Sequence, residues 1–173
     1  IELALNRRTA PELYLRTVAV TRSSDGELDL DGSGEAVEWL VEMTRFDQES
    51  ILDSIAERGE LTAEFIERTS IEIARFHRGA EVSTKFGGGA GIEHVIDGSA
   101  AELRSAPAEM IDAEKAALWE RGARECLDKI RPLLDLRKGR GKVRRCHGDL
   151  HLRNICALDD KPVLFDAIEF SEE

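Results

Sequence analysis

The sequence predicts an α+β fold, in which strands come first, helices follow and a β-hairpin lies near the end of the chain. β-favouring residues run from Leu13 to Val20, and a second strand pattern ends at Val41. Further along, apolar residues recur every three or four positions, which is typical of helices with one buried face. The 173 residues, 42% of them hydrophobic, are enough to bury a core. We therefore predict one domain over residues 1–173.

The first part of the chain is expected to form a short helical segment that ends near Pro11, followed by two or three antiparallel strands. Turn-forming Asp-Gly pairs interrupt the strand pattern at Asp25 and Asp31. From Val37 to Val41 every second residue is valine or tryptophan, which is the period of a strand.

Two longer helices are predicted beyond the strands. The first runs from Leu61 to His77, with Thr62 placed to cap its start, and the second runs from about Ala108 to Leu134. Their predicted buried faces are Phe65, Thr69, Ile73 and Phe76 in the first helix, and Ala116, Trp119, Ala123, Leu127, Ile130 and Leu134 in the second. The glycine-rich run from Gly87 to Gly91 lacks the Lys-Ser/Thr pair of a Walker A loop, and no strand precedes it. We predict that this run is a flexible surface loop.

The residues that suggest chemistry are Asp149, Asn154 and Asp166. Four residues separate Asp149 from Asn154, which allows a tight loop whose two ends face one site. Two short apolar runs then flank the turn-forming stretch from Asp159 to Pro162, a pattern that is typical of a hairpin. We expect this hairpin to carry Asp166 back beside Asn154.

Such a trio suits phosphoryl transfer, in which a protein orients a hydroxyl and holds Mg²⁺ against phosphate oxygens. Asp149 is placed to accept or orient the proton of the hydroxyl. Asn154 and Asp166 offer the oxygen ligands that Mg²⁺ prefers, and Mg²⁺ usually takes only one or two protein ligands besides phosphate and water. The residues themselves therefore indicate a magnesium-dependent phosphotransferase.

The run from His147 to Asn154, with Val163 to Asp166 after it, resembles the catalytic loop and metal-binding aspartate of the aminoglycoside phosphotransferase and choline kinase family, relatives of the protein kinases. It is most similar to a bacterial branch in which this domain precedes a P-loop ATP-binding domain. The segment from Leu3 to Leu15 is similar to part of that branch. The resemblance implies a protein-kinase-like fold, ATP and Mg²⁺ as cofactors, a small-molecule hydroxyl as the acceptor, and a covalently fused P-loop ATP-binding domain in the full-length protein.

The same resemblance implies roles for single residues. Asp149 would be the catalytic base, and His147 would shape the loop. Asn154 and Asp166 would be the Mg²⁺ ligands. The chain departs from the family pattern at two positions: alanine follows the metal aspartate where protein kinases have glycine, and Arg153 stands where many aminoglycoside kinases have glycine.

In the resembled fold, residues 1–41 would be the end of a β-rich N-lobe, 42–46 the hinge, and 47–173 part of a mainly helical C-lobe that carries the catalytic loop. At the hinge the backbone of Glu42 and Met43 would hydrogen-bond adenine. An ordinary connection between a strand and a helix is the alternative interpretation.

A kinase of this type also needs a phosphate-covering loop and a lysine that pairs with a glutamate on a helix. We expect the loop and the lysine to lie upstream of Ile1, and Glu2 is the candidate for the glutamate, with a solvent-facing side chain as the alternative. The chain is therefore expected to be a piece of a longer polypeptide, and this fragment by itself would lack part of the ATP site.

Two other classes of function compete with the kinase. His147, Asp149 and His151 would share one face of a strand, where they could bind Zn²⁺ as in a metal-dependent hydrolase. That interpretation leaves Asn154 and Asp166 without a role, so we prefer the phosphotransferase. The third class is a non-catalytic nucleotide-binding domain, and the presence of the whole Asp-Asn-Asp trio counts against it.

The formal net charge of −11 argues against nucleic acid or an anionic membrane surface as the main partner, because those partners need a basic surface. It would suit a cationic substrate, although solubility is the simpler explanation. The three cysteines, Cys126, Cys146 and Cys156, form neither a CxxC pair nor a disulfide framework. With no signal segment and no apolar run of membrane-spanning length, we predict a cytoplasmic protein with reduced thiols.

Overall fold

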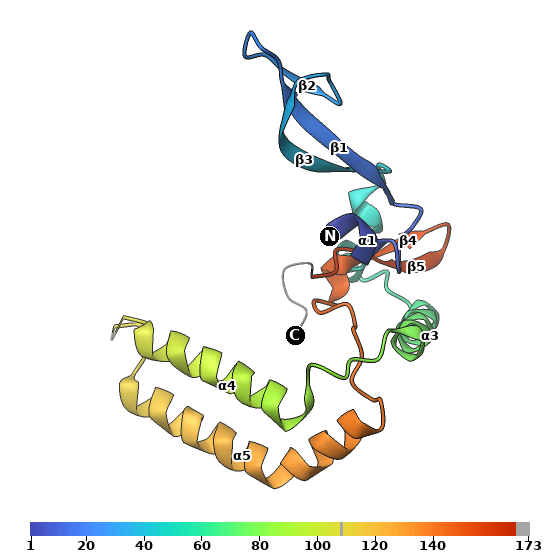
Figure 1. The fold of residues 1–173 in the computed structure, drawn as a ribbon. Coiled ribbons are helices and arrows are strands. Elements are labelled where there is room, and N and C mark those ends of the chain that lie inside the picture. Colours follow the sequence, from blue (N-terminus) through green and yellow to red (C-terminus); the bar gives the residue numbers. More distant parts are fainter. Residues whose placement is uncertain (108, 169–173) are drawn as a thin grey trace. The chain divides into compact units, whose positions relative to one another are not determined.

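The computed structural model describes residues 1–107 and 109–168 (Figure 1). The described residues divide into two compact units, one formed by Ile1–Gly79 with His147–Ile168 and the other by residues 80–146. Within the described residues, no helix is long and apolar enough to cross a membrane. The predicted helix start at Ala108 and the last five residues of the predicted C-lobe part lie outside the described residues.

Helices combine with small antiparallel sheets, so the predicted α+β class is confirmed. The elements of the first unit are α1 (Glu2–Asn6), β1 (Tyr14–Arg22), β2 (Leu28–Leu30), β3 (Glu35–Met43), the 3-10 helix η1 (Gln48–Ser50), α2 (Leu52–Glu57), α3 (Ala63–Gly79), the 3-10 helix η2 (Leu152–Asn154), β4 (Ile155–Leu158) and β5 (Lys161–Leu164). Those of the second unit are α4 (Gly88–Ser105) and α5 (Ala113–Gly139).

The first sheet has the strand order β2-β1-β3, and all its pairs are antiparallel. Val18 lies opposite Leu40, and Val20 lies opposite Leu30 on the other side of β1. Gly26 forms the turn into β2 with φ +91°, a backbone conformation that glycine adopts without steric cost. The prediction of two or three antiparallel strands is therefore confirmed, with three.

The second sheet is the predicted hairpin, formed by β4 and β5. Ile155 pairs with Leu164 at its open end, and the turn consists of Asp159 and Asp160. Both aspartates have positive φ angles, 47° and 60°, as the two-residue turns that match strand twist require. Arg68 on α3 stabilises this turn, because its guanidinium donates to the main-chain oxygen of Asp160 at 2.9 Å and to its carboxylate at 2.8 Å.

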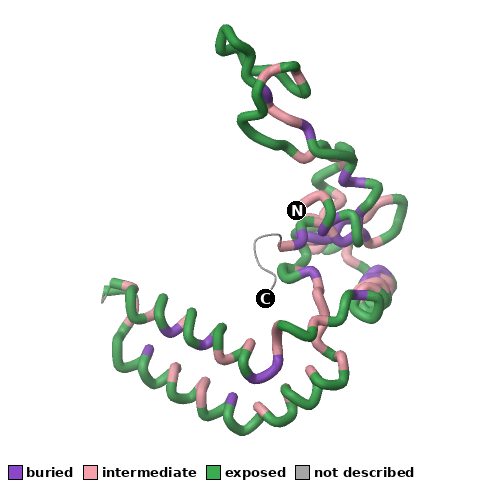
Figure 2. The backbone as a smooth tube through the Cα atoms, in the orientation of Figure 1, coloured by how far each residue is buried: buried purple, intermediate pink, exposed green. Residues whose placement is uncertain are grey.

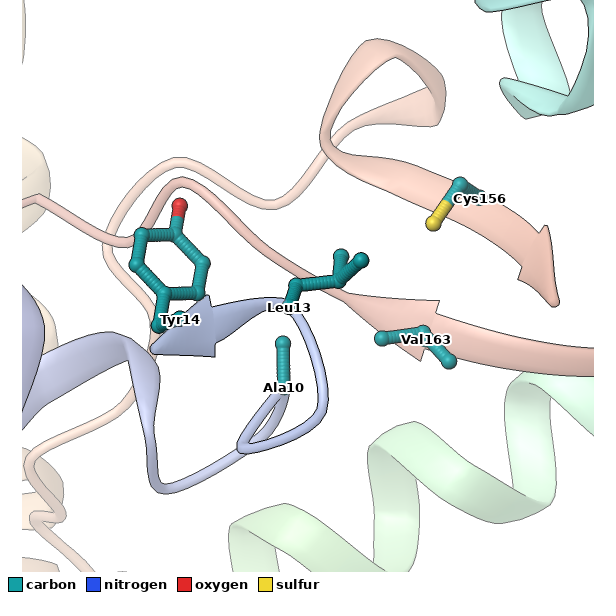
Figure 3. Packing of buried hydrophobic residues seen from close by; sticks show 5 residues of the cluster. All are labelled: Ala10, Leu13, Tyr14, Cys156 and Val163. Atoms are coloured by element: carbon teal, nitrogen blue, oxygen red, sulfur yellow. The ribbon is translucent and has the colours of Figure 1, made fainter. Parts of the chain in front are cut away.

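Side chains alternate along the hairpin, so its two faces pack against different parts of the first unit. One face contributes Cys156 and Val163 to a cluster with Ala10, Leu13 and Tyr14 from the start of the chain (Figure 3). The burial of Cys156 raises the pKa of its thiol to about 11. The opposite face of the hairpin forms a second cluster, which consists of Ile155, Leu164, Leu52 and Phe65. The hairpin thus contributes to both core clusters of this unit, and Figure 2 shows buried stretches among its strands.

Helix α3 confirms the first predicted helix with small shifts at its ends. The hydroxyl of Thr62 accepts the backbone N–H of Phe65 at 3.2 Å, as predicted for a capping residue. Phe65 and Thr69 are buried on the predicted face, and Ile73 and Phe76 pack partly against the second cluster.

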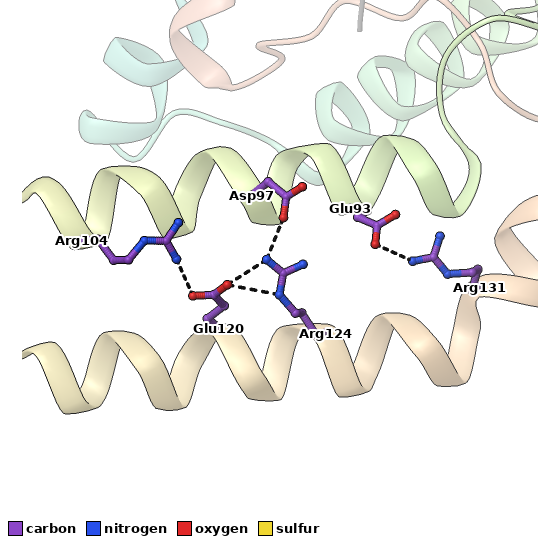
Figure 4. A network of polar contacts seen from close by, with 6 residues as sticks. All are labelled: Glu93, Asp97, Arg104, Glu120, Arg124 and Arg131. Atoms are coloured by element: carbon purple, nitrogen blue, oxygen red, sulfur yellow. Dashed lines mark hydrogen bonds and ion pairs between the residues drawn. The ribbon is translucent and has the colours of Figure 1, made fainter.

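The second unit is a helical hairpin of α4 and α5, and a row of ion pairs follows their contact (Figure 4). Arg124 bridges Asp97 and Glu120 at 2.7 and 2.8 Å, and Arg104 reaches Glu120 at 2.7 Å. Each pair is partly exposed and contributes little by itself, so the row serves mainly to fix which faces of the two helices meet.

The predicted buried face of α5 is wrong at two positions. Ala116 and Leu127 are buried, whereas Trp119 and Ile130 are exposed. Within its unit, α4 is the one described helix that packs against α5, and one helix covers only a narrow stripe of another.

The glycine-rich run is not the predicted surface loop, because it starts α4. Gly87 and Gly88 turn the chain into the helix with φ angles of 73° and 75°. The backbone N–H of Gly89 donates to the carboxylate of Asp135 on α5 at 2.8 Å. A Cβ atom on Gly89 would lie 2.5 Å from Cγ of Arg131, so glycine here permits the close approach of α4 and α5.

Candidate active site

The loop from His147 to Asn154 enters the core of the first unit immediately before β4. Gly148 has φ +91°, and a Cβ atom there would lie 3.1 Å from Cβ of Ile168. Glycine therefore satisfies both the backbone conformation and the space at this turn. The turn leads from a buried histidine to a half-exposed aspartate within two residues.

Asp149 and Asn154 face one site, as their spacing predicts. The Nδ2 group of Asn154 donates to the main-chain oxygen of Asp149 at 2.8 Å and to its Oδ2 at 3.2 Å. Asn154 is buried, whereas the side chain of Asp149 is 52% exposed. The amide therefore closes the loop and leaves the carboxylate of Asp149 open to a ligand.

Asp166 returns to the same place, which confirms the predicted effect of the hairpin. Its main-chain oxygen lies 3.5 Å from Nδ2 of Asn154, and the backbone N–H of Phe165 donates to the main-chain oxygen of Asn154 at 3.0 Å. The ring of Phe165 packs edge-on against Phe46, with 5.4 Å between the ring centroids. Asp166 itself is exposed and has φ +60°.

His147 is a buried residue that links the loop to the strand end. Its Nε2 lies 2.7 Å from the main-chain oxygen of Phe165, and its own main-chain oxygen accepts the N–H of Ile168 at 3.0 Å. Because a carbonyl oxygen can only accept, Nε2 carries the hydrogen, and Nδ1 has no partner in the described part of the chain. These contacts fit the loop-shaping role predicted for His147.

The pKa of His147 is lowered, chiefly because burial disfavours the charged imidazolium, while the nearby carboxylates of Asp149 and Asp166 oppose the shift. The unfolded chain therefore binds this proton more readily than the folded protein. We expect the free energy of unfolding to fall as the pH drops through the ordinary histidine value of 6.5 toward the lowered pKa of the folded state.

Denaturant unfolding in metal-free buffer, between pH 7.5 and pH 5, measures this dependence. His147→Gln keeps a donor for the carbonyl oxygen of Phe165 but cannot titrate, so its pH dependence should be shallower than that of the wild type. His77→Gln is the matched control, because it removes an exposed imidazole. A wild-type slope equal to that of His147→Gln would contradict the assignment.

His151 and Arg153 have no predicted role in phosphoryl transfer, yet they lie within the same loop. The backbone N–H of Arg153 donates to Nδ1 of His151 at 3.2 Å, so the ring hydrogen sits on Nε2, which lies 3.4 Å from Oδ2 of Asp149. Arg153 in turn pairs with Asp53 on α2 at 2.9 Å. These contacts tie the loop to α2.

The three side chains of the His-x-Asp-x-His motif do not converge. The imidazole of His147 is buried against Phe165, whereas that of His151 faces Asp149 from the exposed side. Across residues 1–107 and 109–168, no group of three or more histidine, cysteine, aspartate or glutamate side chains is arranged to hold a metal ion.

A Mg²⁺ ion needs fewer protein ligands than such a cluster supplies, and the side-chain oxygens of Asp166 and Asn154 suit it. Asp166 presents an exposed carboxylate, and the hydrogen bonds of the Asn154 side chain to Asp149 and Asp166 use its nitrogen. Its Oδ1 is therefore left as an oxygen donor among the described contacts. One carboxylate and one amide oxygen are the small protein contribution that Mg²⁺ takes beside phosphates and water.

The remaining predicted residues lie away from this loop in the sequence but in the same unit. Glu42 and Met43 are the last two residues of β3, opposite Arg16 and Tyr14. The carboxylate of Glu42 pairs with Arg16 at 2.6 Å, and Met43 packs partly against the first core cluster. Glu2 opens α1, and its main-chain oxygen accepts from the side chain of Asn6 at 3.2 Å.

Comparison of the chain with protein families, with curated proteins and with solved structures finds no match to any of them.

Proposed function

We propose that this chain carries the active-site loop of an ATP-dependent phosphotransferase that transfers the γ-phosphoryl group to a hydroxyl of a small molecule. The observation that carries the proposal is the amide of Asn154, which joins the loop of Asp149 to the strand end at Asp166. The three residues come from two separate segments, and the carboxylates of Asp149 and Asp166 are both exposed. Such a group has the base and the metal ligands that phosphoryl transfer uses.

In this proposal each residue has a positional task. Asp149 accepts or orients the proton of the acceptor hydroxyl, and the Nε2 hydrogen of His151 faces its carboxylate. Asn154 and Asp166 hold Mg²⁺, which neutralises phosphate charge when bound. The hydrogen bonds of His147 with the main chain of Phe165 and Ile168 hold the loop beside the residues that follow β5. Correct placement supplies most of the rate enhancement in such a site.

The wider proposal is a protein-kinase-like fold in a cytoplasmic enzyme. β3 is an edge strand of its sheet, so its last residues, Glu42 and Met43, have main-chain groups on a side that no other described strand covers. Adenine would hydrogen-bond there. Glu2 would pair with the ATP-binding lysine, and a fused P-loop domain would complete the longer protein.

Diffraction from crystals soaked with Mn²⁺ and an ATP analogue tests the proposal. We expect metal between Asn154 and Asp166 with phosphate oxygens beside it. Metal among His147, Asp149 and His151 would overturn the proposal in favour of a hydrolase. Bound nucleotide and metal without phosphoryl transfer by the intact protein would instead indicate a non-catalytic nucleotide-binding domain.

A further inference from the structure

Two consecutive backbone N–H groups at the strand end, those of Asp166 and Ala167, are bound by side chains from the start of the chain. The N–H of Asp166 donates to the hydroxyl of Tyr14 at 3.1 Å. The N–H of Ala167 donates to Oδ1 of Asn6 at 2.8 Å. Asn6 and Tyr14 therefore form a clamp on the backbone of the candidate metal ligand, and we use the word clamp for these two residues.

Both clamp residues are held firmly. Asn6 is 0% exposed and Tyr14 is 1% exposed. The Nδ2 group of Asn6 donates to the main-chain oxygen of Glu2 at 3.2 Å, so both ends of this amide are engaged. Arg7 donates to the main-chain oxygen of Tyr14 at 2.9 Å and also to that of Leu15. Both clamp residues are thus buried, and hydrogen bonds to neighbouring residues hold them in place.

The backbone of Asp166 needs such support. Its φ angle of +60° lies in the left-handed region, which disfavours every residue except glycine and, to a lesser degree, asparagine and aspartate. Residues in this region keep their conformation only where the surroundings hold them. The clamp binds the N–H of Asp166 itself and the next one along, so it fixes the strained residue from both sides.

We infer that Asn6 and Tyr14 are positioning residues that set the metal affinity of Asp166. The inference rests on the proposed function, since Asp166 is a Mg²⁺ ligand only there. The clamp binds the backbone N–H groups of Asp166 and Ala167, so we expect its effect on a bound metal to pass through the backbone of Asp166. A clamp that only fastened the start of the chain to the hairpin would change stability and leave metal affinity alone.

Tyr14→Phe tests the clamp, because it removes one hydroxyl and keeps the ring that packs in the core. Thr69→Val is the matched control: Thr69 is also buried in the first unit, and its hydroxyl donates to the main-chain oxygen of Phe65 at 2.8 Å, away from the loop. Two quantities are measured for the intact protein. They are the exchange rates of the Asp166 and Ala167 amide hydrogens by NMR without metal, and the dissociation constant of Mn²⁺ with ATP by electron paramagnetic resonance.

We expect Tyr14→Phe to speed exchange at Asp166 and to weaken Mn²⁺ binding, each by about three- to tenfold, the usual effect of one hydrogen bond. Asn6→Ala should act in the same way at Ala167. Mn²⁺ binding by Tyr14→Phe equal to that of Thr69→Val would overturn the positioning role. If the wild type bound no Mn²⁺ with ATP, the proposed function and the inference would both fail, while amide exchange would still report whether the clamp holds Asp166.

Discussion

Asp149→Ala is expected to lower turnover by about 10²- to 10⁴-fold, the usual contribution of a general base, while nucleotide affinity stays close to that of the wild type. The carboxylate of Asp149 is half exposed, and its known contacts are with Asn154 and His151. Its loss would remove the proposed base and leave the proposed metal ligands, Asn154 and Asp166, in place. ADP release by the intact protein, with an alcohol found by screening aminoglycosides, choline and sugars, measures the change.

Asp149→Asn separates basicity from shape, because it keeps the size of the side chain and an oxygen that can accept from Asn154. We expect its turnover to fall almost as far as that of Asp149→Ala. Asp128→Asn is the control, since it removes the same charge from an exposed position on α5 in the other unit. Turnover of Asp149→Asn equal to that of Asp128→Asn would exclude Asp149 as the base.

Local signals made the hairpin and α3 predictable. The turn of the hairpin needs two residues with positive φ, and aspartate tolerates this conformation better than most residues do. In α3 the capping hydroxyl of Thr62 and the buried Phe65 lie three residues apart. In each case the residues that decide the structure are neighbours in the sequence.

The misassigned elements depend on partners that lie far along the chain. The glycine-rich run begins a helix because the carboxylate of Asp135 accepts from Gly89, 46 residues away. The repeat of apolar residues along α5 predicts which residues could be buried. Which of them are buried depends on where α4 packs. Trp119 and Ile130 share the helical period of Leu127, yet α4 leaves both exposed. Periodicity alone does not contain that information.

The same distinction divides the candidate site. Asp149 and Asn154 are five residues apart, and a single turn of hairpin separates Asn154 from Asp166, so the sequence was sufficient to bring the three together. Tyr14 and Asn6 bind the strand end across 152 and 161 residues. A tyrosine and an asparagine near the start of a chain carry no signal for such contacts, and only the fold shows that they support Asp166.

Asp166→Asn is expected to weaken the binding of Mn²⁺ with ATP by about 10- to 100-fold, because a charge-assisted contact is worth roughly 1.5–3 kcal/mol. Asparagine is a better choice than alanine at this position, since φ is +60° and asparagine tolerates the left-handed region. The substitution thus removes the charge of the ligand without adding backbone strain. Metal titration followed by electron paramagnetic resonance measures the change.

Asp159→Asn provides a matched control for this experiment. Asp159 is also exposed and also has a positive φ angle, 47°, but it lies in the turn at the far end of the same hairpin. Both variants change the net charge by the same amount, so a general electrostatic effect would weaken Mn²⁺ binding equally in the two. A loss confined to Asp166→Asn would locate the metal at the strand end. Equal losses would remove Asp166 from the ligand set, and the clamp of Asn6 and Tyr14 would then have no metal ligand to position.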